Sequence, residues 1–248
     1  MEVRNVLVGV FFVVILYVVY IYAFKKKHSS LVTTQKVEKP ISVDIPGNNS
    51  SNAYSMWLYI SQWDVDGEKH VMTRFHKEKS DDSKSYSPTV YLEKNSNTLH
   101  ISYEYMTGDG NKQYDDISIS DFPIQSWTNL IISTNTKTVD VYINGKLVRS
   151  HILNIPPHNP SGKLYLGRLN LKKGSTYPNI KDAVKEVNSY IGYISTVTYY
   201  DEPITPGDAW TIYNKGYDDA GLNPNVLGKY KIKMSILDNN REMNSLEI

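Results

Sequence analysis

VDVYINGKLV, residues 139–148, carries the pattern of a tight antiparallel β-hairpin. Val139, Val141 and Ile143 alternate with other residues, and alternate residues of a strand point to the same side. The pair Asn144-Gly145 follows, and this pair tolerates the positive φ angles of a type I′ turn. We therefore expect two paired strands here, with the three alternating apolar side chains facing a core.

Segments of the same kind recur along most of the chain. They are short, they alternate in polarity, and turn-forming residues separate them, which is typical of a β-sandwich or β-barrel. The predicted strands are Tyr54–Ile60, Val90–Leu92, Leu99–Tyr105, Ile117–Ile119, Thr128–Ser133, Val139–Ile143, Leu147–Ile152, Leu164–Leu166 and Ile191–Tyr200. A last alternating stretch, residues 230–236, is expected either to close the sandwich or to join a partner's sheet.

One short helix is predicted late in the chain. Thr205 can cap it, Pro206 suits the first helical position, and Asp208 completes a capping-box pattern. Gly216 is expected to end it. Because the helix is short, packing against a sheet must stabilise it.

The start of the chain predicts a single transmembrane helix. Residues 6–24, VLVGVFFVVILYVVYIYAF, contain no charged side chain. A helix of this length is about 28 Å long, close to the thickness of the hydrocarbon core of a bilayer. The run is too long for the apolar core of a cleaved signal peptide. Lysines follow it at positions 25–27, where a signal peptide would have small residues at its cleavage site. We expect a retained anchor at 6–24, after a short flank at 1–5.

Charges on the two sides of this run bear on its orientation. Arg4 precedes it, whereas the three lysines at 25–27 and later Lys36 and Lys39 follow it, which favours a C-terminal domain on the cytosolic side. Two overlapping glycosylation sequons, starting at Asn48 and Asn49, would matter only in a secretory lumen. The absence of cysteine fits a reducing compartment without requiring one.

Composition restricts the partners of the chain. Residues 25–51 are polar and contain two prolines, so they are expected to form a tether with at most one short strand, at 41–45. The net charge of the whole chain is only +1, and the basic residues around the apolar run supply much of the positive charge. The remainder is weakly acidic, which disfavours nucleic acid as a partner.

Several motifs, in order, resemble one family. Four motifs carry the likeness: Trp127 before a strand, a Tyr-x-Asn-Gly hairpin at 142–145, a Leu-x-Leu-Gly segment at 164–167, and a Gly-x-Ile strand at 192–194 that leads to Ile204-Thr205-Pro206. Their order resembles that of the laminin G, pentraxin and concanavalin A-like lectin/glucanase superfamily. The resemblance covers residues 52–217 and implies an all-β, two-sheet antiparallel jelly-roll sandwich with one short C-terminal helix. It also implies that the Trp127 side chain lies in the hydrophobic core. Residues 218–248 lie outside the resemblance, and we expect a final strand and a polar tail there.

The enzymes of this superfamily offer a test for catalysis. Retaining glucanases place carboxylates in a Glu-x-Asp-x-x-Glu pattern on one strand, so that two of them flank the glycosidic bond. This sequence has no such run, and its nearest acidic cluster, residues 64–68, contains the turn signal Asp66-Gly67. The six histidines show no metal-ligand spacing. We expect no enzymatic activity.

Two groups of residues are candidate ligands. Laminin G and pentraxin domains often bind calcium at a rim loop, and Asp109, Asn111 and Asp115 supply the oxygen atoms that calcium prefers. A polar loop in water is the alternative. Tyr103, Tyr105 and Tyr142 lie on predicted strands, where aromatic rings either stack on sugars or pack in the sheet.

The sequence thus predicts a single-pass, membrane-anchored, non-catalytic laminin G/lectin-like module that binds a carbohydrate or a protein surface. No cofactor is expected apart from calcium. One alternative is a structural scaffold that tethers a membrane to a protein layer, such as a minor capsid/membrane protein at the internal membrane of a large virus. A glycosidase is the third hypothesis.

Overall fold

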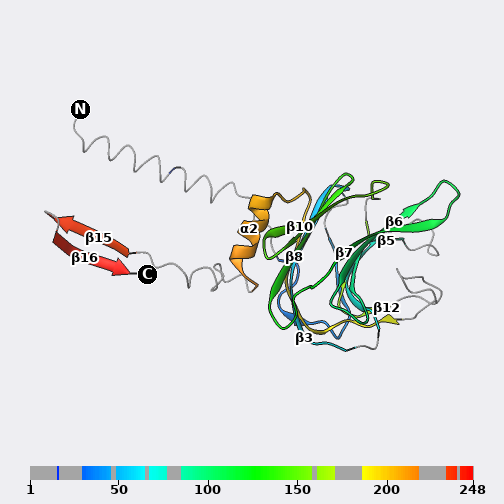
Figure 1. Cartoon of the computed structure of the whole chain (residues 1–248), viewed down its shortest axis with the longest axis horizontal. Helices are drawn as coiled ribbons and strands as arrows, with labels where there is room; N and C mark the ends of the chain where they lie inside the picture. The colour runs from blue at the N-terminus through cyan, green and yellow to red at the C-terminus, as the bar shows by residue number, and fades with distance from the viewer. Residues whose placement is uncertain are drawn as a thin grey trace.

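The structure is a computed structural model that describes Leu16 and residues 30–45, 49–64, 67–76, 85–157, 161–170, 186–217, 233–238 and 241–247. Two curved, six-stranded antiparallel sheets stack face to face (Figure 1). The first sheet has the order β1 (Gln35–Lys36), β14 (Ile191–Tyr200), β3 (Asn52–Gln62), β8 (Thr128–Asn135), β9 (Thr138–Ile143) and β10 (Lys146–Ile152). The second has the order β2 (Ile41–Val43), β11 (Leu164–Leu166), β4 (Lys69–His76), β5 (Ser85–Leu92), β6 (Leu99–Met106) and β7 (Lys112–Ile119). A separate two-stranded ribbon pairs β12 (Leu169–Asn170) with β13 (Glu186–Val187). The predicted two-sheet antiparallel sandwich is therefore confirmed.

The hydrophobic core lies between the two sheets. Strand β3 shows the underlying alternation, because Met56, Leu58 and Ile60 face the core while Trp57 and Tyr59 lie on the other side of the strand. All nine predicted strands listed above fall within observed strands. Strand β4 was not predicted, since it reads KHVMTRFH and two register shifts break its alternation.

The hairpin at 139–148 forms as predicted. Val139 and Val141 are fully buried, and Ile143 packs against the same core. Asn144 and Gly145 have positive φ angles of 51° and 74°. Asn144 also forms two hydrogen bonds with the backbone of Asn129 in β8. Its side-chain oxygen accepts from the N–H of Asn129 at 2.9 Å, and its own backbone N–H donates to the carbonyl of Asn129 at 2.9 Å.

The expected boundary of the sandwich at residue 52 requires correction. Residues 35–36 and 41–43 form β1 and β2, one in each sheet, and Val32 and Val37 are core residues. The backbone N–H of Leu31 already donates to the carbonyl of Val197 at 2.7 Å. Most of the segment predicted as a tether at 25–51 is therefore part of the sandwich, because its short strands gain partners that are remote in sequence.

Helix α2 (Pro206–Lys215) packs on the outer side of the first sheet (Figure 1). The Thr205 side chain accepts from the backbone of Asp208, the Asp208 side chain accepts from the backbone of Thr205, and Gly216 ends the helix at φ 84°. The predicted capping box and stop are confirmed. Ala209 and Ile204 cover Tyr142, Ile131 and Ala53 of the sheet.

The C-terminal segment differs from its prediction. Strands β15 (Lys233–Asp238) and β16 (Arg241–Glu247) pair antiparallel with each other. The expected last strand at 230–236 is only partly described, and the expected polar tail contains a strand instead. This stretch therefore finds its partner locally, in the segment that follows it.

The predicted flank at 1–5 and membrane helix at 6–24 lie outside the described residues, except for Leu16. Among the helices that the structure does describe, none has both the length and the apolar character needed to cross a membrane.

Candidate ligand-binding face

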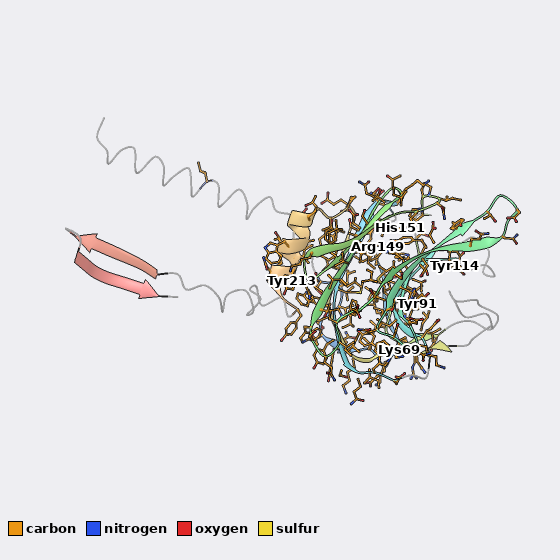
Figure 2. All side chains as sticks on the ribbon, in the orientation of Figure 1. Lys69, Tyr91, Tyr114, Arg149, His151 and Tyr213 are labelled. Carbon is orange, nitrogen blue, oxygen red and sulfur yellow. The ribbon has the colours of Figure 1, made fainter. Side chains whose placement is uncertain are left out.

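Polar side chains gather on the outer face of the second sheet. Because β6 alternates, Leu99, Ile101 and Tyr103 enter the core while His100 and Ser102 point outward. Strand register sets their neighbours: Tyr91 of β5 lies opposite His100, which lies opposite Ser118 of β7, and Ser102 lies opposite Asp116. We call this group the polar face: Tyr91, His100, Ser102, Asp116 and Ser118. Figure 2 labels Tyr91 on this sheet.

Asp116 is the centre of a hydrogen-bond network on the polar face. Its Oδ2 lies 2.6 Å from Nδ1 of His100, and its Oδ1 accepts from the Ser102 hydroxyl at 2.6 Å. The Tyr91 hydroxyl reaches the same Oδ1 at 3.5 Å. The rings of Tyr91 and His100 stack with centroids 5.0 Å apart and planes inclined by 8°. These contacts fix the carboxylate and the imidazole on a rigid sheet.

The pKa values of His100 and Asp116 are shifted in opposite directions, upward for His100 and downward for Asp116. The hydrogen bond with Asp116 raises the pKa of His100, and the nearby carboxylates of Glu93 and Glu68 add to it, while burial opposes the change. Burial alone would raise the pKa of Asp116, but the hydrogen bonds from His100 and Ser102 outweigh it and lower that pKa. Both shifts favour an imidazolium–carboxylate pair.

This arrangement suits binding better than nucleophilic catalysis. In a Ser-His-Asp triad the imidazole lies between the hydroxyl and the carboxylate. Here the carboxylate of Asp116 lies between Ser102 and His100, so the serine hydroxyl donates to the carboxylate and not to the imidazole. An ionised carboxylate has about four acceptor positions, and the described neighbours use three of them, which leaves one among the described contacts for a ligand donor. Solvent reaches the face at Asp116 and His100, whose side chains are 34% and 16% exposed, whereas Tyr91 and Ser102 are buried.

The three predicted tyrosines do not form a stacking platform. Tyr103 is a core residue whose hydroxyl lies 2.8 Å from that of Thr134. Tyr142 is buried beneath helix α2, and its hydroxyl donates to the Ile204 carbonyl at 3.4 Å. Tyr105 is half-buried, and its hydroxyl donates to the side chain of Gln113 at 2.9 Å. Burial leaves the rings of Tyr103 and Tyr142 no surface to offer a ligand.

The three predicted calcium ligands are not brought together. Asp109 and Asn111 bond to each other in the loop between β6 and β7, with Asn111 Nδ2 donating to Asp109 Oδ2 at 2.6 Å. Asp115 instead accepts from the backbone and side-chain N–H groups of Asn154, at 2.7 and 2.5 Å. Its carboxylate is committed because alternate residues of β7 leave it on the side of the strand opposite to Asp116. Across the described segments, no group of three or more histidine or acidic side chains could hold a metal ion.

Sequence reasoning missed the polar face. The signal was a His-x-Ser pair at 100–102 within a predicted strand, followed by an aspartate at 116 beside the next one. Only the register of β6 against β7 brings these residues together. Trp127, expected in the core, is half-buried and stacks on Tyr217 instead, with ring centroids 4.4 Å apart.

Comparisons with known proteins agree with this fold. A laminin G family profile, described as concanavalin A-like lectin/glucanases superfamily, matches residues 33–208. A search of curated protein sequences found no match.

Solved structures of botulinum neurotoxin domains are similar to the chain. One is the serotype D ligand binding domain in complex with N-acetylneuraminic acid, with a TM-score of 0.51, 12% identity, and coverage of 76% of this chain and 43% of that one. Another is the receptor binding domain of the C/D mosaic serotype, with a TM-score of 0.50, 12% identity, and coverage of 76% and 44%. This chain spans less than half the length of either, and at such identity the likeness concerns the fold alone. With the family profile matching well over half of its length, the chain belongs to the concanavalin A-like lectin/glucanase superfamily.

Proposed function

We propose that this protein is a membrane-anchored, non-catalytic lectin-like module whose polar face binds a carbohydrate. The observation that carries the proposal is the solvent-accessible Asp116 carboxylate, which His100 and Ser102 hold and whose described contacts leave one acceptor position. Sugar hydroxyl groups are the donors that such a carboxylate recognises, and an orienting network lowers the entropy cost of binding. The chemistry of the face therefore fits a hydroxyl-rich ligand.

The anchor in this proposal is the apolar run at 6–24, and its support is sequence: nineteen residues without a charge, followed by lysines at 25–27. The lysines favour a domain on the cytosolic side. A second observation supports that orientation, because the side-chain amide of Asn49, a sequon residue, donates to the Asp201 carbonyl at 3.2 Å. A glycan on this nitrogen would disturb the contact.

A glycan array followed by calorimetry tests the carbohydrate proposal. The full-length chain, held in a neutral detergent micelle, is screened against neutral and sialylated glycans, the latter because a similar structure contains N-acetylneuraminic acid. Replacing Asp116 by Asn removes a charged acceptor, worth about 1.5 to 3 kcal/mol. The affinity should fall roughly tenfold or more.

The matched control is Asp44→Asn, because this carboxylate is 83% exposed at the end of β2 and pairs only with Lys163 in the described surroundings. It should bind like the wild type. Glycan binding that survives Asp116→Asn unchanged, or no binding to any glycan, would contradict the proposal. Hydrolysis of a glycan that Asp116→Asn abolishes would identify a glycosidase instead.

A scaffold function is the second candidate, and the edge strand β10 favours it. Leu147, Val148 and Ile152 on this strand are 49%, 45% and 73% exposed. Exposed apolar groups on a sheet edge are suited to a protein partner. A photoreactive residue at position 152 should then cross-link one major protein in producing cells, and Ile152→Asp should abolish its capture. Diffuse cross-linking to many proteins would reject this candidate.

A further inference from the structure

The outer face of the first sheet carries a continuous row of aromatic rings that the proposed ligand site does not use. At its centre, Trp127 stacks on Tyr217 with centroids 4.4 Å apart and planes inclined by 8°. Tyr217 in turn contacts Trp57 at 6.1 Å, and Trp57 stacks on Tyr213 of helix α2 at 5.6 Å. Tyr213 is labelled in Figure 2, on the helix that covers this sheet.

The row continues in both directions. Tyr59 links Trp127 to Tyr193, with centroid distances of 5.5 and 6.4 Å. At the other end Trp210 contacts Tyr213 at 5.6 Å. We call the rings from Tyr193 to Trp210 the aromatic face.

Internal packing accounts for the middle of this row but not for its ends. Trp57 is only 3% exposed, since helix α2 and the segment after it cover the ring. Tyr193 and Trp210, in contrast, are 36% and 45% exposed. Large exposed rings that extend a packed aromatic row indicate a surface with a partner.

The position of the aromatic face relative to the predicted anchor identifies that partner. The domain begins at Leu31, which bonds to Val197 of β14, and Lys36 of β1 lies opposite Tyr193. Only five residues, 25–29, separate Ser30 from the end of the apolar run. Even a fully extended chain of that length spans only about 20 Å. The sheet that carries the aromatic face is therefore the part of the domain tied nearest to the bilayer.

The face is also rigid, as a docking surface must be. Tyr217 is held by its backbone carbonyl, which accepts from the hydroxyls of Ser195 at 2.5 Å and of Thr196. Both hydroxyls belong to β14, so the backbone of Tyr217 cannot leave the sheet without breaking two hydrogen bonds, and its ring is packed against Trp127. Basic groups flank the row, with Lys36 at the Tyr193 end and Lys215 in the last turn of helix α2.

We propose that the aromatic face lies in the headgroup region of the bilayer that the segment 6–24 enters. Tryptophan and tyrosine favour this region because their rings are apolar while their N–H or O–H groups reach water, and lysines meet the lipid phosphates. The inference rests on the anchor of the proposed function. It has one geometric consequence: since the two sheets stack face to face, the polar face points away from the membrane and stays open to ligands.

Tryptophan quenching by brominated lipids tests this docking. The full-length chain is reconstituted into phosphatidylcholine vesicles with one-fifth phosphatidylserine, prepared with and without bromine on the acyl carbons nearest the headgroup. Bromine quenches a tryptophan only on near contact, so the wild type should lose emission in the brominated vesicles. Trp210→Phe should remove most of that loss. The control is Trp63→Phe, whose ring lies under the ammonium of Lys69 instead of in the aromatic row, and it should keep the full loss.

Retention of the protein by the vesicles after an alkaline wash is scored in the same samples, so two failures are distinguishable. Retained protein with equal emission in both lipids overturns the docking and leaves the anchor intact. Retained protein whose quenching is the same in Trp210→Phe as in the wild type also overturns it, because the exposed end of the row then makes no lipid contact. Protein released by the wash overturns the anchor, and the docking with it.

Discussion

A buried histidine should make this fold sensitive to mild acid. His70 of β4 is completely buried between two fixed partners, with Nδ1 2.5 Å from the Gly167 carbonyl and Nε2 2.7 Å from the Thr73 hydroxyl. A carbonyl can only accept, so Nδ1 carries the proton and Nε2 accepts from Thr73. Protonating Nε2 would put a charge in the interior, where burial disfavours it.

The size of the effect follows from the shift in pKa. Burial lowers the pKa of His70 to about 4 from its ordinary value of 6.5, although hydrogen bonds with the backbone of Gly167 and Met72 act in the opposite direction. The unfolded chain therefore binds this proton more readily than the folded one. The stability that His70 contributes is complete above pH 6.5 and is lost as the pH falls toward 4. The total loss is about 3 kcal/mol, of which about 2 kcal/mol is lost between pH 7 and pH 5.

Urea unfolding of the full-length chain in neutral detergent, followed by tryptophan emission at pH 7 and pH 5, measures this loss. His70→Gln keeps a polar group that cannot take up a proton in this range, so its free energy of unfolding should fall by about 2 kcal/mol less than that of the wild type. His100→Gln is the matched control. Compared with the wild type, its free energy of unfolding should respond to the drop from pH 7 to pH 5 in the sense opposite to that of His70→Gln. Its hydrogen bond to Asp116 raises the pKa of His100, so its contribution is complete below pH 6.5 and is lost as the pH rises through the folded value.

Equal acid sensitivity in the wild type and His70→Gln would refute this reasoning, because the histidine would then titrate alike in the folded and unfolded chain. If His70→Gln does not fold, an NMR titration of His70 in the wild type decides the matter. A folded pKa near 6.5 would refute the prediction just as clearly.

Three further perturbations test local features. Thr205→Ala removes half of the capping box and should cost about 1 kcal/mol of unfolding free energy in urea. Gly145→Ala and Gly110→Ala both force a side chain onto positive φ, at a cost of about 1 to 2 kcal/mol. Gly145→Ala should cost more, since its new Cβ would lie 3.0 Å from two aromatic side chains of helix α2 while the one at Gly110 meets nothing within 4 Å, and equal losses would contradict this packing. Adding a calcium chelator should leave the midpoint of thermal unfolding unchanged, because Asp115 already accepts hydrogen bonds from Asn154. A lower midpoint in the chelator would contradict this and support the calcium site predicted from the sequence.

The candidate site shows why a sequence can predict strands and still miss what they bring together. His100 and Asp116 are sixteen residues apart, and each lies in or beside a predicted strand. Their contact depends on register, and a shift by one residue would turn one of them into the core. The prediction of Tyr103 and Tyr142 as ligand-binding residues was wrong for a related reason. Alternation predicts which residues of a strand share a side, but it does not predict which side is covered by another sheet or by a helix.

The sequence by itself determined the local elements of this protein. Alternating strands, the Asn-Gly turn at 144–145 and the capping box at Thr205 each depend on interactions within a few residues, and each formed as predicted. Only the tertiary structure decided that residues 31–43 join the sandwich, that Asp116 meets His100, and that seven aromatic rings form one row. These outcomes depend on contacts between residues far apart in the chain, and their free energy exists only once both sheets have formed.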